Sequence, residues 1–343
     1  MKVVLRFIVA FCAVATLSAC GGDRWRDYHA LTCGTTCNIT YRSAVDLSDS
    51  ITILLNAIES EISVFDPQSP VSALNRGEDI VASHILRRVI LASKEIADMS
   101  GGACDPTVGP LVELWGFGSS AGHPVPTDAA IDSALATVGI AGCRILPDGH
   151  ISKKTGATSF NFGAIGKGFA AQEVVSMLRR NGVNDCMVEV GGDLALSGVN
   201  ARGTEWLLQV DAPVENSGTP THEQLMTISL SDYGIATSGN YRNYRDNADT
   251  GRRYGHTISP LTGRPVATDV LSATVIAPDA AMADGLATAC MVLGSEASLN
   301  MASRHAGIEI MLVTAAADSV AATSPWRIVA SPEFPLSDRN PNQ

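Results

Sequence analysis

A carboxylate and a hydroxyl lie four residues apart in the sequence A-M-A-D-G-L-A-T-A, as Asp284 and Thr288. On an α-helix, side chains four residues apart share one face, so both groups could contact one ion. Carboxylate and hydroxyl oxygens are hard ligands that suit Mg²⁺, which keeps its other positions for phosphate, water or a carbonyl. The alternative is that Asp284 caps a helix or lies at the surface, which is the commoner role for a single such pair.

His256 lies in the sequence Y-G-H-T-I-S-P, directly before a turn that contains proline. It is not buried within an apolar stripe, so a hydrogen-bonded histidine of the core is the less favoured interpretation. Because imidazole titrates near neutral pH, His256 is a candidate general base. Thr237, Ser238 and Asn240, in an upstream segment that we interpret as a turn, are small donors suited to contacts with an anion.

Two glycine-rich segments interrupt the apolar patterns. In G-A-I-G-K-G, residues 163–168, a tight turn with Lys167 runs into a predicted helix, and a helix N-terminus beside a lysine can hold a diphosphate. The segment matches neither common phosphate-loop pattern, and a plain strand-to-helix turn with a solvated lysine is an equally good interpretation. In the second segment, residues 100–118, Asp105 precedes Pro106, which keeps the backbone extended.

Apolar spacing predicts the elements that must position these residues. Helices are expected over residues 49–65, 79–99, 127–138, 168–181 and 280–293, and strands over 187–190, 206–210, 225–230, 273–277 and 308–314. Thr127 is the expected N-cap of the third helix. Helices and strands are clustered rather than strictly alternating, so the predicted fold class is α+β.

The bulk composition narrows the function classes. The chain has 343 residues, of which 45% are hydrophobic and 17% charged, as in globular proteins. Its net charge of -11 provides no basic field for a phosphate backbone, so no nucleic acid is expected as a partner. An anionic ligand would need local positive charge from a metal ion, a lysine or a helix N-terminus.

The first residues predict export. Residues 1–19 have the charged and apolar regions of a signal peptide, and their last three residues form with Cys20 the sequence L-S-A-C, which resembles a bacterial lipobox. Cys20 would then be lipidated and anchor the chain on the periplasmic side of a bacterial membrane, with residues 20–31 as a tether. The alternative is an ordinary signal peptide cut near Ala19. No later run is long and apolar enough for a transmembrane helix.

Six cysteines remain beyond Cys20, and they are interpreted for an oxidising compartment. Cys186 and Cys290 lie in apolar runs and are expected to be buried. A disulfide between Cys33 and Cys37 stays open, because spacing alone does not define its geometry.

Taken together, these segments resemble the ApbE family, the FAD:protein FMN transferases. The resemblance runs from Thr32 to Leu312 and includes, in the family's order, GGACDPTVGPLVELWGFG, FGAIGKGFA, VEVGGDLALSG, ATSGNYR, YGHTISPLTGRPV and ADGLATACMVLG. It implies a two-lobed fold with a flavin-binding cleft over residues 32–332, followed by a C-terminal tail over residues 333–343.

The resemblance also assigns roles by position. It places the metal site on the carbonyl of Ala164 and the side chains of Asp284 and Thr288, and the catalytic base on His256. The expected FAD contacts are Cys33, Phe65, Ala103, Cys104, Asp105, Asn161, Lys167 and Ile258. Departures from the usual residues fall on the flavin and adenosine pocket: Cys33 for Met, Phe65 for Tyr, Asn161 for Asp, Cys104 for a larger apolar residue and Gly166 for Ala.

The implied activity is magnesium-dependent transfer of FMN from FAD to a Thr or Ser hydroxyl of a target protein, with release of AMP. The implied partner is a flavoprotein with a D-x-x-[ST]-G-A-[ST] type motif. A magnesium-dependent FAD pyrophosphatase and a non-catalytic flavin-binding lipoprotein are the alternatives. The sequence T-G-A-T, residues 155–158, resembles the end of the acceptor motif, although an ordinary turn is the favoured interpretation of it.

Overall fold

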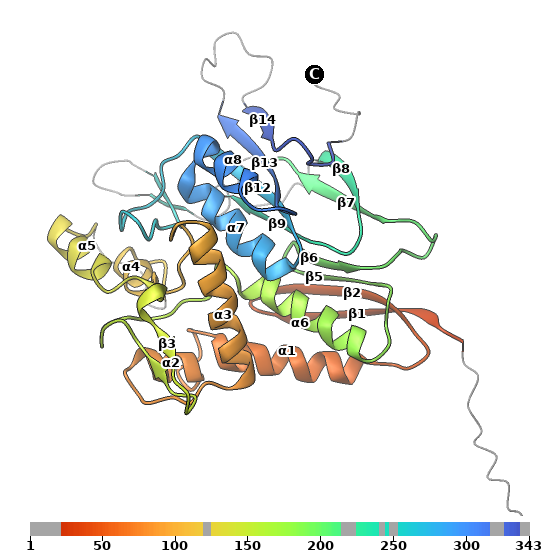
Figure 1. The fold of residues 1–343 in the computed structure, drawn as a ribbon, viewed down its shortest axis with the longest axis horizontal. Coiled ribbons are helices and arrows are strands. Elements are labelled where there is room, and N and C mark those ends of the chain that lie inside the picture. Colours follow the sequence, from red (N-terminus) through yellow and green to blue (C-terminus); the bar gives the residue numbers. More distant parts are fainter. Residues whose placement is uncertain are drawn as a thin grey trace, which may run out of the picture.

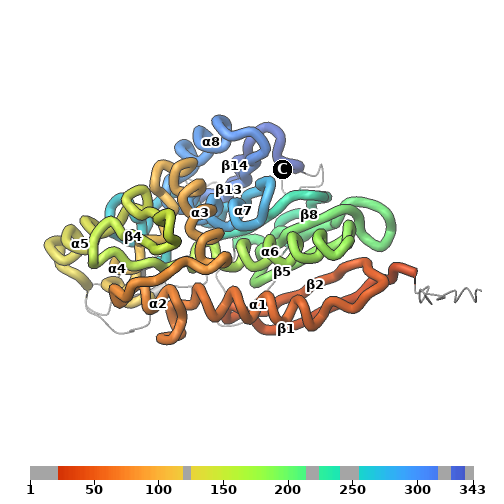
Figure 2. The backbone as a smooth tube through the Cα atoms, turned by 60° about the horizontal axis from the view of Figure 1, so that its bottom comes forward, coloured from red at the N-terminus to blue at the C-terminus, as the bar shows by residue number. Residues whose placement is uncertain are grey.

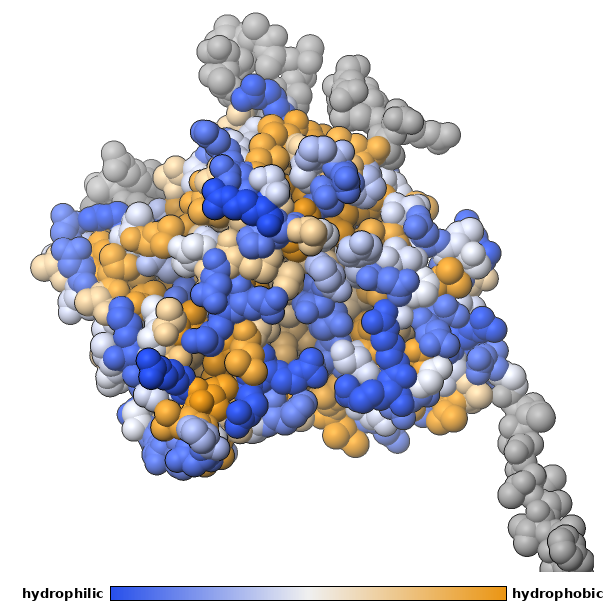
Figure 3. Space-filling model, in the orientation of Figure 1, coloured by the Kyte–Doolittle hydropathy of each residue, from blue (hydrophilic) through white to orange (hydrophobic). Residues whose placement is uncertain are grey.

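The computed structural model describes residues 22–118, 125–213, 224–239, 244–246, 253–315 and 326–336. The predicted signal peptide and Cys20 lie outside these residues. Within them, no helix is both long enough and apolar enough to cross a membrane. Hydrophilic and hydrophobic residues are interspersed over the face shown in Figure 3.

An eight-stranded antiparallel sheet forms the centre of the molecule (Figure 1). Its strands, in spatial order, are β1 (Arg24–Thr32), β2 (Thr35–Ser43), β5 (Cys186–Val190), β6 (Asp193–Ser197), β9 (Gly234–Gly239), β12 (Val270–Ala277), β13 (Glu309–Ala315) and β14 (Trp326–Ala330). Three two-stranded sheets accompany it: β3 (Arg144–Ile145) with β4 (Ile151–Ser152), β7 (Trp206–Asp211) with β8 (Gln224–Leu230), and β10 (Tyr244–Asp246) with β11 (Arg253–Gly255).

The helices are α1 (Ser48–Ile62), α2 (Pro70–Asn75), α3 (His84–Met99), α4 (Gly109–Leu114), α5 (Asp128–Leu135), α6 (Gly166–Arg180), α7 (Ala280–Leu293) and α8 (Ser295–Ser303), with a 3-10 turn at Ile140–Gly142. Helices α6 and α7 pack on the sheet and on each other, α1 packs beside α6, and α3 crosses α7. Figure 2 shows α4, α5 and β4 gathered at the end of the molecule opposite the end where β1 begins. The predicted α+β class is confirmed.

Alternation along the strands separates two cores. Val275 and Ile276 are neighbours on β12, yet Val275 lies in the core beneath α6 and α7, whereas Ile276 packs with the β7–β8 hairpin. This follows from the two-residue period of a strand, which sends successive side chains to opposite faces. The helices therefore cover one face of the sheet and the β7–β8 hairpin covers part of the other.

The predicted helices form; the last has the predicted bounds of 280–293, and the other four have shifted ends. The third begins at Asp128 with Thr127 as N-cap, as expected. The second begins only at His84, because Ser83 caps it by accepting a hydrogen bond from the backbone N–H of Leu86, and Val81 before it forms a bridge with His150.

Three expectations about chain organisation differ from the structure. Residues 24–31, expected in the tether, belong to strand β1, which pairs with β2 along its whole length. Phe334, expected in the tail, is only 4% exposed and packs in the core under the β7–β8 hairpin. The segment with Thr237 and Ser238, interpreted as a turn, is strand β9 in the middle of the sheet.

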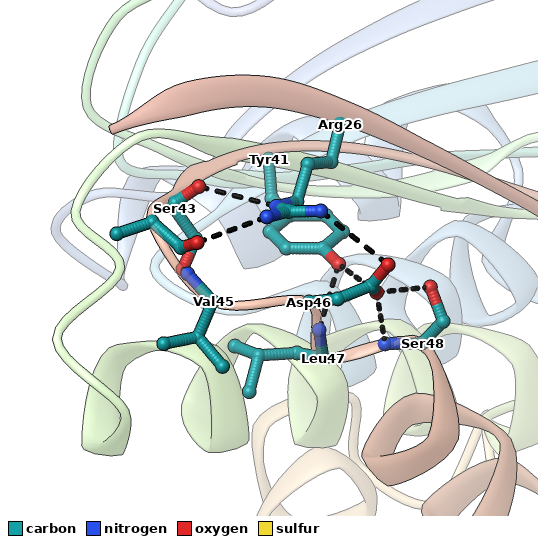
Figure 4. Close-up of polar contacts among 8 residues, drawn as sticks. Arg26, Tyr41, Ser43, Val45, Asp46, Leu47 and Ser48 are labelled. Atoms are coloured by element: carbon teal, nitrogen blue, oxygen red, sulfur yellow. Dashed lines mark hydrogen bonds and ion pairs between the residues drawn. The ribbon is translucent and has the colours of Figure 1, made fainter. Parts of the chain in front are cut away.

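A polar cluster fixes the junction between β2 and α1 (Figure 4). The buried Tyr41 hydroxyl accepts from the backbone N–H of Leu47 (3.0 Å) and donates to Asp46 Oδ1 (3.2 Å). Arg26, on β1, donates to the carbonyl of Ser43 (3.1 Å) and forms an ion pair with Asp46 (3.3 Å). The hairpin at the sheet edge is thereby tied to the start of α1.

Candidate active site

The site begins where α6 meets α7. A Cβ on Gly168, in the first turn of α6, would lie 2.1 Å from the carbonyl oxygen of Ala280 and 2.7 Å from Cβ of Asp284. Glycine is therefore required for this close approach of the two helices. It lets the backbone N–H of Gly168 donate to Asp284 Oδ2 at 3.0 Å, which fixes the carboxylate at the N-terminus of α6.

Asp284 lies in the middle of α7 and is only 3% exposed. The N-cap of α7 is Asp279, which accepts from the backbone N–H of Met282 at 2.8 Å. The ordinary alternative for Asp284, a cap or a surface charge, is therefore wrong. A buried carboxylate must be compensated by hydrogen bonds or by positive charge.

Lys167 supplies that positive charge, and its ammonium group also forms an ion pair with a second buried carboxylate. Its Nζ lies 2.5 Å from Asp193 Oδ2 and 3.6 Å from Asp284 Oδ1. Burial lowers the pKa of Lys167, but the charges of Asp284 and Asp193 outweigh burial and the net pKa is raised. The pKa of Asp193 is also raised, by burial and then by the charge of Asp284, against the opposing effect of Lys167. With both carboxylates ionised, these three side chains carry one negative charge in excess.

Thr288 follows Asp284 by one helical turn, as the sequence predicted. Its Oγ1 lies 3.2 Å from Oγ of Ser238 on β9, which packs against α7. Ser238 was expected to contact an anion, and the structure places it beside the predicted magnesium ligand. Asn240, its expected companion, lies outside the described residues.

Ala164 lies in the turn that leads into α6, and the turn is held from two sides. Asn161 Oδ1 accepts from the backbone N–H of Gly163 at 2.8 Å. Asn75 clamps the preceding Phe160, accepting from its N–H (2.7 Å) and donating to its carbonyl (2.8 Å). The carbonyl of Ala164, the predicted metal ligand, thus belongs to a backbone segment that hydrogen bonds hold in place, three residues before Lys167.

Three of the residues predicted to contact FAD form one buried segment. Ala103, Cys104 and Asp105 are buried in the loop after α3. Both carboxylate oxygens of Asp105 are engaged locally, Oδ1 by the N–H and hydroxyl of Thr107 and Oδ2 by the N–H of Ile140. Any contact of Asp105 with a ligand is therefore expected through its backbone, and its side chain holds the loop.

Two thiols lie within electrostatic reach of Asp284. Burial, then the charges of Asp284 and Asp105, raise the pKa of Cys104. Cys33, at the tip of the β1–β2 hairpin with φ 51, has a raised pKa chiefly because of burial, and both Lys167 and Asp284 influence it. Its backbone N–H donates to Glu59 at 3.2 Å. Cys33 and Cys37 are both free thiols, so the structure does not contain the disulfide that the sequence left open.

The remaining three predicted residues come from separate segments of the chain and differ in exposure. Phe65, after α1, is 71% exposed. Ile258 is buried against Leu111, Trp115 and Ile131, in the small core of α4 and α5. His256 is half-buried, directly after β11.

Asp193 is the residue of the cluster that sequence reasoning missed. It follows Gly191 and Gly192, which both have positive φ and form the turn between β5 and β6. In the sequence, G-G-D is typical of an exposed turn, so its burial could not be inferred from the local pattern. A Cβ on Gly191 would lie 3.0 Å from Cδ of Lys167, so this turn packs directly on the lysine.

Thr158 is excluded as an acceptor hydroxyl in the folded state. It is fully buried, and its Oγ1 donates to the carbonyl of Thr137 at 2.8 Å. The turn interpretation of residues 155–158 agrees with this arrangement.

The donor set around Asp284 fits a hard divalent cation. The described residues contain no group of three or more His, Cys, Asp and Glu side chains arranged to hold a metal ion. A metal here would depend on one carboxylate, a hydroxyl and a backbone oxygen, which are hard oxygen ligands that suit Mg²⁺ rather than a metal that prefers sulfur or imidazole. With both carboxylates ionised, the excess negative charge of the buried cluster would favour such a cation.

Comparisons with known proteins identify relatives over most of the chain. The profile of the ApbE family matches residues 33–312. A Vibrio cholerae protein named FAD:protein FMN transferase is 34% identical over 293 residues, which cover 82% of this chain and 85% of the relative. An Escherichia coli protein of the same name is 29% identical over 310 residues, 88% of this chain and 85% of the relative.

Solved structures share the fold. The flavin transferase ApbE from Vibrio cholerae superposes with a TM-score of 0.78 at 31% identity, covering 91% of this chain and 98% of that one. The apo flavinyl transferase ApbE from Pseudomonas stutzeri has a TM-score of 0.77 at 29% identity, covering 90% and 95% of the two chains.

Proposed function

We propose that this chain, which belongs to the ApbE family, transfers the FMN half of FAD to a hydroxyl group of an acceptor protein. The observation that carries the proposal is the match, over most of both chains, to relatives named FAD:protein FMN transferase. The buried cluster of Asp284, Lys167 and Asp193 supports it, because transfer of a phosphoryl-type group needs fixed charges around a diphosphate.

Asp284, Thr288 and the carbonyl of Ala164 would hold Mg²⁺. When bound, the metal would neutralise charge that develops on the FAD diphosphate. Lys167, at the N-terminus of α6, adds a fixed positive charge beside that position, and the α6 N-terminus favours an anion there.

His256 is the proposed general base. It would take the proton of the acceptor Thr or Ser, whose oxygen forms a bond to the phosphorus on the FMN side. The bond from that phosphorus to the bridging oxygen breaks, and AMP leaves with both electrons of that bond. The acceptor is expected to carry a D-x-x-[ST]-G-A-[ST] type motif, and lipidation at Cys20 would keep the enzyme on the periplasmic side of a membrane.

One assay separates transfer from its rivals. The purified protein is incubated with FAD, Mg²⁺ and an acceptor that carries the motif, and the products are analysed by mass spectrometry and chromatography. Transfer gives covalent FMN on the acceptor and free AMP. Free FMN with AMP would identify a pyrophosphatase, and unchanged FAD would identify a flavin-binding lipoprotein without turnover.

Asp284→Ala should abolish transfer, because it removes the only carboxylate of the proposed metal site. Asp279→Ala is the matched control: it removes a carboxylate from the same helix, at the N-cap of α7, and should cost about 1 kcal/mol of stability while leaving the transfer rate above half of wild type. Retention of transfer by Asp284→Ala in chelator-treated buffer would contradict the metal role.

A further inference from the structure

The ammonium of Lys167 lies at unequal distances from two carboxylates. It lies 2.5 Å from Asp193 Oδ2 but 3.6 Å from Asp284 Oδ1. Since the Coulomb energy of two charges varies inversely with their separation, the interaction energy of Lys167 with Asp193 is about 1.4 times that with Asp284 over these two distances at equal dielectric. Asp193 is therefore the nearer partner of Lys167 and the one within hydrogen-bond distance.

The position of Asp193 is built into the sheet. Asp193 begins β6 opposite Val190 on β5, and the Gly191–Gly192 turn between them packs on the Lys167 side chain. The residue is only 2% exposed. Its carboxylate thus comes from the sheet, whereas Lys167 and Asp284 come from α6 and α7.

Without Asp193, the ammonium would have one ion-pair partner left among the residues that the structure describes. Lys167 is within ion-pair distance of Asp284, the proposed metal ligand. A lysine that moves onto this carboxylate competes with a divalent cation for the same oxygen. An ammonium held by Asp193 stays 3.6 Å from Asp284 Oδ1, beyond hydrogen-bond distance, while Asp284 Oδ2 accepts from the N–H of Gly168.

We propose that Asp193 is a positioning residue that holds Lys167 away from Asp284 and so keeps the Asp284 carboxylate available for the divalent cation. This inference rests on the proposed function, because it assumes that Asp284 binds the metal. Residues that orient or support metal ligands typically change affinity by about 10- to 100-fold when replaced.

The test is magnesium binding alone, measured by titration calorimetry on the purified full chain after metal removal and without FAD. Asp193→Asn should weaken the Kd for Mg²⁺ by about 10-fold. Lys167→Met should bind Mg²⁺ at least as tightly as wild type, because the competing ammonium is gone. The double variant Asp193→Asn/Lys167→Met should bind like Lys167→Met, within about 3-fold, since it has no lysine left to position.

This cycle separates positioning from other roles. If Asp193→Asn weakens binding equally with and without Lys167, Asp193 is itself a ligand or a structural residue, and the proposal is overturned. Unchanged affinity in Asp193→Asn would also overturn it. Thermal unfolding reports whether each variant folds; should Asp193→Asn not fold, weaker Mg²⁺ binding by Lys167→Met would overturn the proposal by itself.

Failure of the proposed metal site gives a different result. A wild-type chain that binds no Mg²⁺ would overturn the metal role of Asp284, and the role of Asp193 with it. If the wild-type chain binds Mg²⁺ and Asp193→Asn binds it with the same affinity, only the role of Asp193 is overturned.

Discussion

At the scale of single residues, the site depends on the lack of a side chain at Gly168 as much as on the side chains that contact Asp284. Gly168 lets α6 and α7 approach closely enough for its backbone N–H to reach Asp284. Asp284 and Thr288 were found from sequence because their spacing matches one helical turn. Asp193 and Gly168 were not assigned roles, because their importance comes from packing between segments far apart in the chain.

Gly168→Ala should destabilise the protein by about 1–3 kcal/mol, since the added methyl overlaps the Ala280 carbonyl. It should also weaken Mg²⁺ binding, because the two helices must separate. Gly166→Ala is the matched control two residues earlier: its Cβ would meet only Ile62 Cδ1, at 3.5 Å. We expect that variant to be neutral or up to about 1 kcal/mol more stable in urea unfolding. Equal effects of the two substitutions would contradict the close-packing argument.

At the scale of elements, the β1–β2 hairpin depends on its junction with α1. Tyr41→Phe removes the hydroxyl that accepts from Leu47 N–H and should cost about 1–2 kcal/mol in urea unfolding. Tyr28→Phe, which removes an exposed hydroxyl 2.9 Å from Thr52 Oγ1, is the control and should cost less than about 0.5 kcal/mol. A loss from Tyr28→Phe as large as that from Tyr41→Phe would show that the junction is not special.

The ion pair between α6 and α3 makes a pH-dependent contribution to the free energy of unfolding. Glu173 on α6 is buried, and Oε1 lies 2.7 Å from Arg88 on α3, yet this oxygen has no hydrogen bond of good geometry. Burial raises the pKa of Glu173, opposed first by the charge of Arg88. A carboxyl with a raised folded pKa favours folding most below its unfolded value, near 4.5, and this contribution is lost as pH rises through the folded pKa.

Glu173→Gln should therefore gain stability relative to wild type as pH rises above about 4.5, measured by urea unfolding at several pH values. Arg88→Met should have the opposite effect, because it removes the charge that lowers the pKa of Glu173. An unchanged pH dependence in Glu173→Gln would show that another group dominates.

Sequence patterns predicted helices better than edge strands. Helix α7 and strand β12 are mostly apolar, with few polar residues, so their existence could be predicted from the sequence. Strand β1, R-W-R-D-Y-H-A-L-T, is charged and half-exposed as a sheet edge requires, and it was interpreted as tether. Strand β9 is rich in small residues because α7 packs against it: a Cβ on Gly234 would lie 2.3 Å from Ala280 N. Small residues alone indicate a turn, and only the packed fold shows why a strand needs them.

At the scale of the whole molecule, β1 is part of the folded body. A chain that begins at residue 33 should be less stable and should aggregate, because the edge of β2 becomes exposed and Tyr28 and Ala30 no longer pack on the core. A chain that begins at Gly22 should stay monodisperse in size-exclusion chromatography. Equal behaviour of the two chains would contradict a structural role for β1.

The direction of β1 also sets the distance between the proposed lipid anchor and the candidate active site. The strand starts at Arg24, next to the proposed anchor, and ends at Thr32, directly before Cys33, which feels the charges of Lys167 and Asp284. Nine residues in extended conformation span roughly 27–30 Å. With Cys20 in a membrane, this strand would act as a rigid spacer that holds the reactive centre at least one strand length along the molecule from the point of attachment. Acceptors would then be modified efficiently only where their hydroxyl can reach a centre at that distance from the point of attachment.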